Sequence, residues 1–153
     1  MRKWTLIVLV VFILPSFAGI RENRRTPNRL EIDGASYGRG WIVSSPTLHS
    51  PDGYLVYDAT GKSPKVSVGG TKGPQATWTF VGEKRYHEEL ANRGRTPGTD
   101  SERRGWSMKL RAAAGPFAGW YLGHKDGSLI LVKDPARAAT VALVGKECDI
   151  IHK

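Results

Sequence analysis

The segment Ala76-Thr77-Trp78-Thr79-Phe80-Val81-Gly82 recurs 63 residues later as Ala139-Thr140-Val141-Ala142-Leu143-Val144-Gly145. In both copies large apolar residues alternate with small or polar ones, which is the pattern of a strand with one buried face. Three pairs of segments upstream match at similar spacing: Gly40-Trp41 with Gly105-Trp106, Tyr54-Leu55 with Tyr121-Leu122, and Val66-Ser67-Val68 with Ile130-Leu131-Val132. Because all offsets lie between 63 and 67 residues, one unit present twice explains every match.

Each copy predicts four short strands, in residues 40–82 for the first copy and 105–145 for the second. Gly, Pro, Asp and Ser, the residues that turns require, fill the connections between the predicted strands. In the second copy, Lys125-Asp126-Gly127-Ser128 is the signature of a tight hairpin. The sequence therefore predicts an all-β fold, a small antiparallel barrel built from two four-strand repeats.

Each copy opens on an aromatic residue and carries a Tyr-Leu step after a glycine, and the first copy closes near Gln75-Ala76-Thr77-Trp78. This pattern resembles the lobe of a β-trefoil, as in the ricin-B-like lectin and fascin-like families. Lobes of these families usually close on Gln-x-Trp, whereas the spacing here is one residue longer and Val141 replaces the second tryptophan. The resemblance covers residues 40–145 except the insert between the copies. It implies non-catalytic recognition, most often of sugars, at shallow sites on the lobes.

A β-trefoil has three lobes, and two are visible in this sequence. Two lobes alone would leave edge strands unpaired. Three arrangements would close the barrel: a degenerate third lobe made from the segments outside the copies, closure of eight strands into another small barrel, or pairing with a second chain. The sequence leaves all three open.

Residues 1–18 have the order of a secretory signal peptide. Arg2 and Lys3 precede an apolar run from Leu6 to Leu14, which is followed by Pro15-Ser16-Phe17-Ala18. The run is too short for a membrane span, which needs about 20 apolar residues. We therefore expect cleavage after Ala18, a secreted or periplasmic location, and no transmembrane segment in the processed chain.

Three segments lie outside the two copies in the processed chain. Residues 19–39 are rich in Arg, Asn, Pro and Gly and predict a basic flexible arm. Residues 83–104 are dense in charge without a sustained apolar face and predict an insert loop. Residues 146–153 form a C-terminal tail, in which Cys148 is the only cysteine of the chain, so no disulfide forms within it.

No pattern of catalytic residues stands out. The four histidines are scattered, and Ala91 occupies the place of the second histidine in a zinc-binding helix that would begin at His87. The aspartates lie in turn contexts, which explains them without a pair of catalytic carboxylates. We expect no enzymatic activity, no catalytic residues, no metal and no cofactor; hydrolysis of a glycan is the one enzymatic alternative.

Five residues are the candidates for ligand binding. Trp120, His124 and Asp126 follow one another closely, and an exposed tryptophan beside polar groups suits a sugar ring. Packing at the rim of the barrel is the structural alternative for Trp120. Lys109 and Arg111 fall on one face of a strand and would favour an anionic ligand.

The net charge agrees with such a ligand. The whole chain has a formal charge of +9, and removal of Arg2 and Lys3 with the signal peptide leaves +7. Outside the cytoplasm, polysaccharides and other polyanions are available to a basic protein, whereas nucleic acid is not expected there. The sequence predicts a non-catalytic binding module for carbohydrate or an anionic cell-surface polymer. The alternative is a structural or interaction protein that docks through an open sheet edge onto a partner or, as a homodimer, onto itself.

Overall fold

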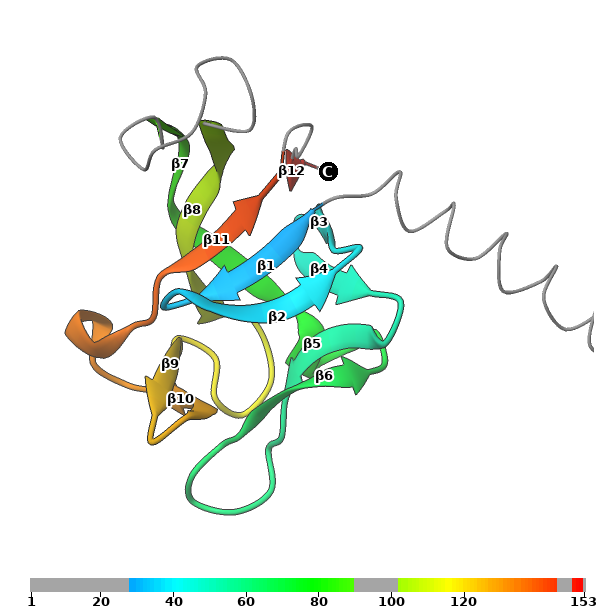
Figure 1. The fold of residues 1–153 in the computed structure, drawn as a ribbon. Coiled ribbons are helices and arrows are strands. Elements are labelled where there is room, and N and C mark those ends of the chain that lie inside the picture. The colour runs from blue at the N-terminus through cyan, green and yellow to red at the C-terminus, as the bar shows by residue number, and fades with distance from the viewer. Residues whose placement is uncertain (1–27, 90–101, 146–149, 153) are drawn as a thin grey trace, which may run out of the picture.

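Two β-sheets curl around one core in this computed structural model, which describes residues 28–89, 102–145 and 150–152 (Figure 1). Twelve strands and two 3-10 turns are present in these residues: β1 (Arg29–Ile32), β2 (Ala35–Arg39), β3 (Ile42–Ser44), β4 (Thr47–Ser50), β5 (Gly53–Tyr57), β6 (Val66–Gly70), η1 (Pro74–Ala76), β7 (Trp78–Glu89), β8 (Glu102–Ala112), β9 (Tyr121–Lys125), β10 (Ser128–Val132), η3 (Pro135–Arg137), β11 (Val141–Val144) and β12 (Ile150–Ile151). The predicted all-β, barrel-like fold is confirmed.

The larger sheet has the order β10-β9-β8-β11-β1-β2, with β7 also paired to β8, and it curls into half a barrel (Figure 1). The smaller sheet has the order β12-β3-β4-β5-β6. All pairs are antiparallel except β12 with β3. The two sheets meet where the edge strands β6 and β10 approach, through a bridge between Lys65 and Ile130 and a 2.9 Å hydrogen bond from the amide of Leu131 to the carbonyl of Pro64.

The strands predicted from the two copies are all present, as β3, β5, β6 and β7 in the first and as β8, β9, β10 and β11 in the second. A 3-10 turn precedes the closing strand of each copy. The structure adds β4, in a segment that the sequence assigned to a turn, because Leu48 enters the core and pairs opposite Val43.

The two Tyr-Leu steps occupy similar positions, each on the first strand of a hairpin. Leu55 and Leu122 are both fully buried, while Tyr54 and Tyr121 on the opposite face are half-buried. The indole Nε1 of buried Trp78 donates a 3.0 Å hydrogen bond to the carbonyl of Leu55, which joins the closing strand to the hairpin. The copies differ just before these steps, because a side chain at Gly53 would lie 2.7 Å from the backbone of Gly69, whereas the second copy has Trp120 there.

The predicted flexible arm, residues 19–39, is wrong from residue 29 onward. Residues 29–39 form the hairpin β1–β2, and β1 lies between β11 and β2 in the larger sheet. Leu30 and Ile32 are fully buried, whereas the intervening Glu31 pairs with Arg29 at 2.6 Å. The charged residues obscured a short alternation of apolar and polar side chains that is typical of a strand. Residues 19–27 and the predicted signal peptide lie outside the described residues, so the cleavage site stays a prediction.

The predicted insert loop, residues 83–104, is wrong at both ends, where β7 and β8 continue as a long hairpin. Their pairing extends from Trp78 opposite Ala112 to Glu89 opposite Glu102, with an irregularity between Val81 and Lys84. The sequence lacks apolar alternation here because the ribbon extends away from the core (Figure 1). Residues 90–101 lie outside the described part.

The C-terminal tail, residues 146–153, contributes β12, which adds to the edge of the smaller sheet in parallel with β3. Together, β1, β2 and β12 supply strands that the two copies lack. No helix within residues 28–89, 102–145 and 150–152 is long and apolar enough to cross a membrane.

Candidate functional site

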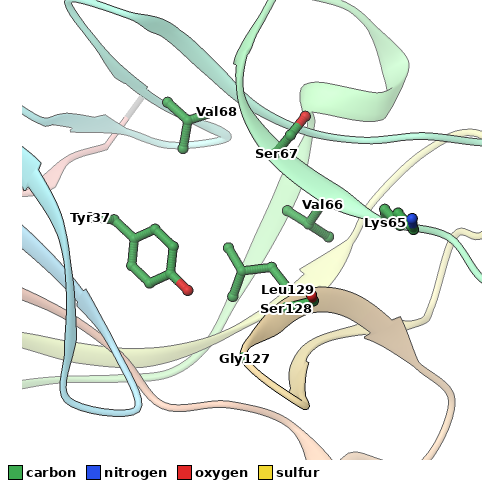
Figure 2. A pocket seen from close by; sticks show the side chains of 8 residues that line it. All are labelled: Tyr37, Lys65, Val66, Ser67, Val68, Gly127, Ser128 and Leu129. Atoms are coloured by element: carbon green, nitrogen blue, oxygen red, sulfur yellow. The ribbon is translucent and has the colours of Figure 1, made fainter.

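An open hollow of about 330 Å³ lies where three edge strands come together, β2 and β10 of the larger sheet and β6 of the smaller (Figure 2). Its volume falls within the usual range of small-ligand sites, about 300–1,000 Å³. The lining residues are Tyr37, Lys65, Val66, Ser67, Val68, Gly127, Ser128 and Leu129. They come from three parts of the chain that are far apart in sequence.

Apolar side chains form the floor of the hollow. Val66 and Leu129 are buried and Val68 is half-buried, and Figure 2 shows all three grouped around the ring of Tyr37. Strand alternation turns Ser67 toward solvent between the two valines. Exposed polar groups therefore border an apolar floor, namely Lys65 and Ser67 on the side of β6 and Ser128 on the side of β10.

Tyr37 forms one wall of the hollow and is fixed at both ends. Its backbone carbonyl accepts a 3.0 Å hydrogen bond from the indole Nε1 of buried Trp41. Its hydroxyl lies 3.1 Å from Nε2 of His124 on β9. The ring consequently has a defined position between the core and the hollow, which a half-buried aromatic side chain on an edge strand would otherwise lack.

Asp33 continues this chain of polar groups beyond His124. One carboxylate oxygen of Asp33, Oδ2, lies 3.9 Å from Nδ1 of His124, and the other accepts a 2.9 Å hydrogen bond from the amide of Thr140. The amide of Asp33 donates back to the carbonyl of Thr140 at 2.9 Å, so the β1–β2 turn is attached to the residue before β11. Asp33, His124 and Tyr37 thus form a chain of polar groups, of which Tyr37 lines the hollow.

Burial raises the pKa of the Tyr37 hydroxyl above its ordinary value, and the negative charge of Asp33 raises this pKa further. Both effects favour the neutral phenol over the phenolate. The hydroxyl therefore keeps its proton at physiological pH and can both donate and accept a hydrogen bond.

The structure places the predicted site residues in separate environments. Trp120 is half-buried and packs edge-on against Phe117, with ring centroids 5.1 Å apart. His124 lies four residues further along, about 13 Å away in an extended chain, and contacts Tyr37 instead. Trp120 and His124 therefore have different aromatic partners, Phe117 and Tyr37. Asp126 is exposed in the β9–β10 turn, one residue before the lining of the hollow.

Lys109 and Arg111 share the outer face of β8, as predicted, while Met108 and Leu110 face the core. The ammonium of Lys109 donates a 2.9 Å hydrogen bond to the carbonyl of Ala138. The guanidinium of Arg111 lies over the ring of Tyr121, 6.0 Å from its centroid. Both cations have structural contacts, and neither lines the hollow.

Asp33 and Tyr37 were missed as site residues at the level of sequence, because both fell in the predicted arm. One signal was available, since Asp33-Gly34 follows the alternating Leu30-Glu31-Ile32 just as Asp126-Gly127 follows β9. Both dipeptides have positive φ at both residues, 49° and 83° in the first and 52° and 79° in the second. Asp-Gly pairs in this conformation are typical of two-residue hairpin turns.

No group of three or more His, Cys, Asp or Glu side chains in the described part of the chain is arranged to hold a metal ion. Comparisons with protein-family models, with curated proteins and with solved structures find no match to this chain. Fold and site together define a small all-β, barrel-like domain with an open hollow between its strand edges.

Proposed function

We propose that this chain is an exported, non-catalytic binding module, and that the hollow between β2, β6 and β10 holds a carbohydrate unit of an extracellular or cell-surface polymer. The observation that carries the proposal is the combination of a half-buried tyrosine ring, an apolar floor, and hydroxyl and ammonium groups at the rim.

This combination matches the chemistry of a sugar, which has apolar C–H faces and a perimeter of hydroxyl groups. The ring of Tyr37 and the side chains of Val68 and Leu129 offer surface for the C–H groups. Ser128, Lys65 and the Tyr37 hydroxyl supply hydrogen-bonding groups at the edge. Because the hollow is open, it suits one unit of a chain that continues on both sides.

Two features of the sequence support an extracellular polymer as the source of this unit. The first 18 residues have the features of a secretory signal peptide, and the processed chain would carry a formal charge of +7. Positive charge attracts acidic polysaccharides at low ionic strength. The resemblance of the two copies to β-trefoil lobes points in the same direction.

Binding to immobilised neutral and acidic polysaccharides tests the proposal, at ~50 mM salt, where charge contacts are least screened. We expect retention of the wild-type chain on at least one polymer. Ser128→Trp places a bulky side chain at the rim from an exposed position and is expected to weaken binding about tenfold, the equivalent of ~1.4 kcal/mol. Thr71→Trp, exposed beyond β6 and outside the hollow, is the matched control and should bind normally.

Two outcomes would contradict the proposal. Failure of the wild-type chain to bind any polymer at low salt would remove the function. Unchanged binding by Ser128→Trp, with a circular dichroism spectrum like that of the wild type, would remove the hollow as the site.

A second candidate function is self-association through the edge of the smaller sheet. Ile42 on β3 and Ile151 on β12 are 43% and 50% exposed, and β12 is the edge strand. Exposed apolar edges favour pairing with another chain. Light scattering at micromolar concentration should then give a dimer that Ile151→Lys disperses, because an edge lysine opposes strand pairing. A monomeric wild-type chain would remove this alternative.

A further inference from the structure

We propose that Tyr37 contacts an anionic group of the bound sugar unit, such as the carboxylate of a uronic acid, and that protonation of His124 directs the Tyr37 hydroxyl toward this group. The inference rests on the proposed function and assigns its ligand class. It follows from the polar chain formed by Asp33, His124 and Tyr37, which ends at the hollow.

The neutral form of His124 turns the Tyr37 hydroxyl away from an anionic ligand. A neutral imidazole carries one N–H, and the carboxylate of Asp33, 3.9 Å from Nδ1, attracts that hydrogen to Nδ1. Nε2 then has only a lone pair toward Tyr37, so the tyrosine donates its hydrogen across the 3.1 Å contact. The hydroxyl offers only lone pairs to the hollow, and a carboxylate has no hydrogen to donate to them.

Protonation of His124 reverses the direction of this hydrogen bond. Both ring nitrogens of an imidazolium donate, so Nε2 now donates to the Tyr37 oxygen. The hydroxyl hydrogen of Tyr37 is released and can be donated to an acceptor in the hollow. A carboxylate or a sulfate ester, which only accepts, gains a charge-assisted hydrogen bond and the attraction of a nearby positive charge.

A neutral hydroxyl of a sugar responds differently, since it can donate in one state and accept in the other. Its affinity should therefore depend little on the protonation of His124. The pH dependence consequently reports whether the ligand group at Tyr37 is anionic, and it distinguishes acidic from neutral sugars in the same site.

The other charges near the ring agree with this mechanism. Asp33 is the carboxylate that faces His124, with its Oδ2 3.9 Å from Nδ1. Lys125 and Asp126 follow His124 in the exposed β9–β10 turn, and Lys65 lies on the β6 side of the hollow. Leu129, the residue opposite His124 on β10, is apolar. The high pKa of Tyr37 keeps the proton on its oxygen in both states.

Isothermal titration calorimetry of the full chain tests the inference with three probes: an oligogalacturonate, a neutral oligosaccharide of the same length, and a sulfated one. At constant ionic strength, we expect oligogalacturonate to bind about tenfold tighter at about pH 5.5 than at about pH 7.5, the effect of one charge-assisted hydrogen bond. The neutral probe should change less than about twofold. A pH response with only the sulfated probe would identify a sulfate ester instead of a carboxylate.

Three variants assign the response to this chain of groups. His124→Gln keeps a polar side chain without a titrating group and should bind oligogalacturonate equally at both pH values. Tyr37→Phe keeps the ring and should retain the neutral probe while losing the pH response. His152→Gln is the matched control, because His152 is exposed and pairs with Glu83 at 2.9 Å, and its pH response should equal that of the wild type.

The outcomes separate this inference from the proposed function. Failure of all three probes at either pH, together with failure to bind any immobilised polymer at low salt, contradicts the proposed function itself. Binding with an unchanged pH response in His124→Gln contradicts only the inference. A measurement without ligand adds a third test, because the nitrogen chemical shifts of His124 at high pH should show the hydrogen on Nδ1. A hydrogen on Nε2 would mean that His124 donates to Tyr37 in both states, which overturns the inference.

Discussion

Replacement of Leu30 and Ile32 together by alanine is expected to remove most of the stability of this protein. Both side chains are fully buried and lie opposite Leu143 and Val141 of β11. Each large-to-small change in a core costs about 2–5 kcal/mol. Their sum is comparable with the whole stability of a typical domain, about 5–15 kcal/mol. We expect the double variant to be largely unfolded at room temperature or to unfold at the lowest urea concentrations, as followed by circular dichroism.

Ser36→Ala provides the control for this experiment, because Ser36 lies on the same hairpin but is exposed. It should unfold at nearly the same urea concentration as the wild type. If the double variant also unfolds like the wild type, residues 29–39 behave as the flexible arm that their composition predicts, and β1 does not pack into the core.

Trp78→Ala is expected to be among the most destabilising single substitutions in the core. Trp78 is 1% exposed, and its indole donates to the carbonyl of Leu55. The change removes a large volume from the core and leaves that carbonyl without this partner, and Trp→Ala changes typically cost about 3–5 kcal/mol. Urea unfolding followed by far-ultraviolet circular dichroism measures this cost without depending on tryptophan fluorescence.

Val141→Ala is the informative comparison, because Val141 occupies the equivalent position of the second copy and is fully buried. It removes fewer atoms and no side-chain hydrogen bond, so the loss should be clearly smaller than for Trp78→Ala. Equal losses would contradict the role assigned to the bond between the indole and Leu55. A loss below about 1 kcal/mol for Trp78→Ala would contradict the core position itself.

The hairpin β1–β2 links stability and the proposed function. Leu30 and Ile32 anchor it in the core, while Asp33 in its turn and Tyr37 on its second strand form the polar chain with His124. Substitutions that loosen this hairpin should therefore weaken ligand binding before they unfold the barrel.

The pattern of residues within short segments was sufficient to predict much of the fold. The alternation in Trp78-Thr79-Phe80 and in Val141-Ala142-Leu143, and the Asp126-Gly127 turn, each depend on neighbours within a few residues. The matching offsets then predicted two related units without any knowledge of how they pack. The same reasoning placed Lys109 and Arg111 on one face of a strand, and β8 confirms this.

The candidate site was predicted less well, for a physical reason that its residues illustrate. Tyr37, Val68 and Leu129 line one hollow although they are separated by long stretches of chain. Nothing in the sequence near Tyr37 indicates that β6 and β10 approach it. Trp120 looked available for a ligand, but its packing against Phe117 arises from a loop whose conformation the strand pattern does not describe.

The strands of the two copies and the turns between them can be predicted from the amino-acid order, because alternation and turn chemistry act over short distances. That residues 29–39 belong to the barrel emerges only from the folded chain, since the burial of Leu30 depends on pairing with Leu143 more than a hundred residues away. The position of the hollow likewise depends on tertiary packing, because the hollow exists only where edges of the two sheets meet.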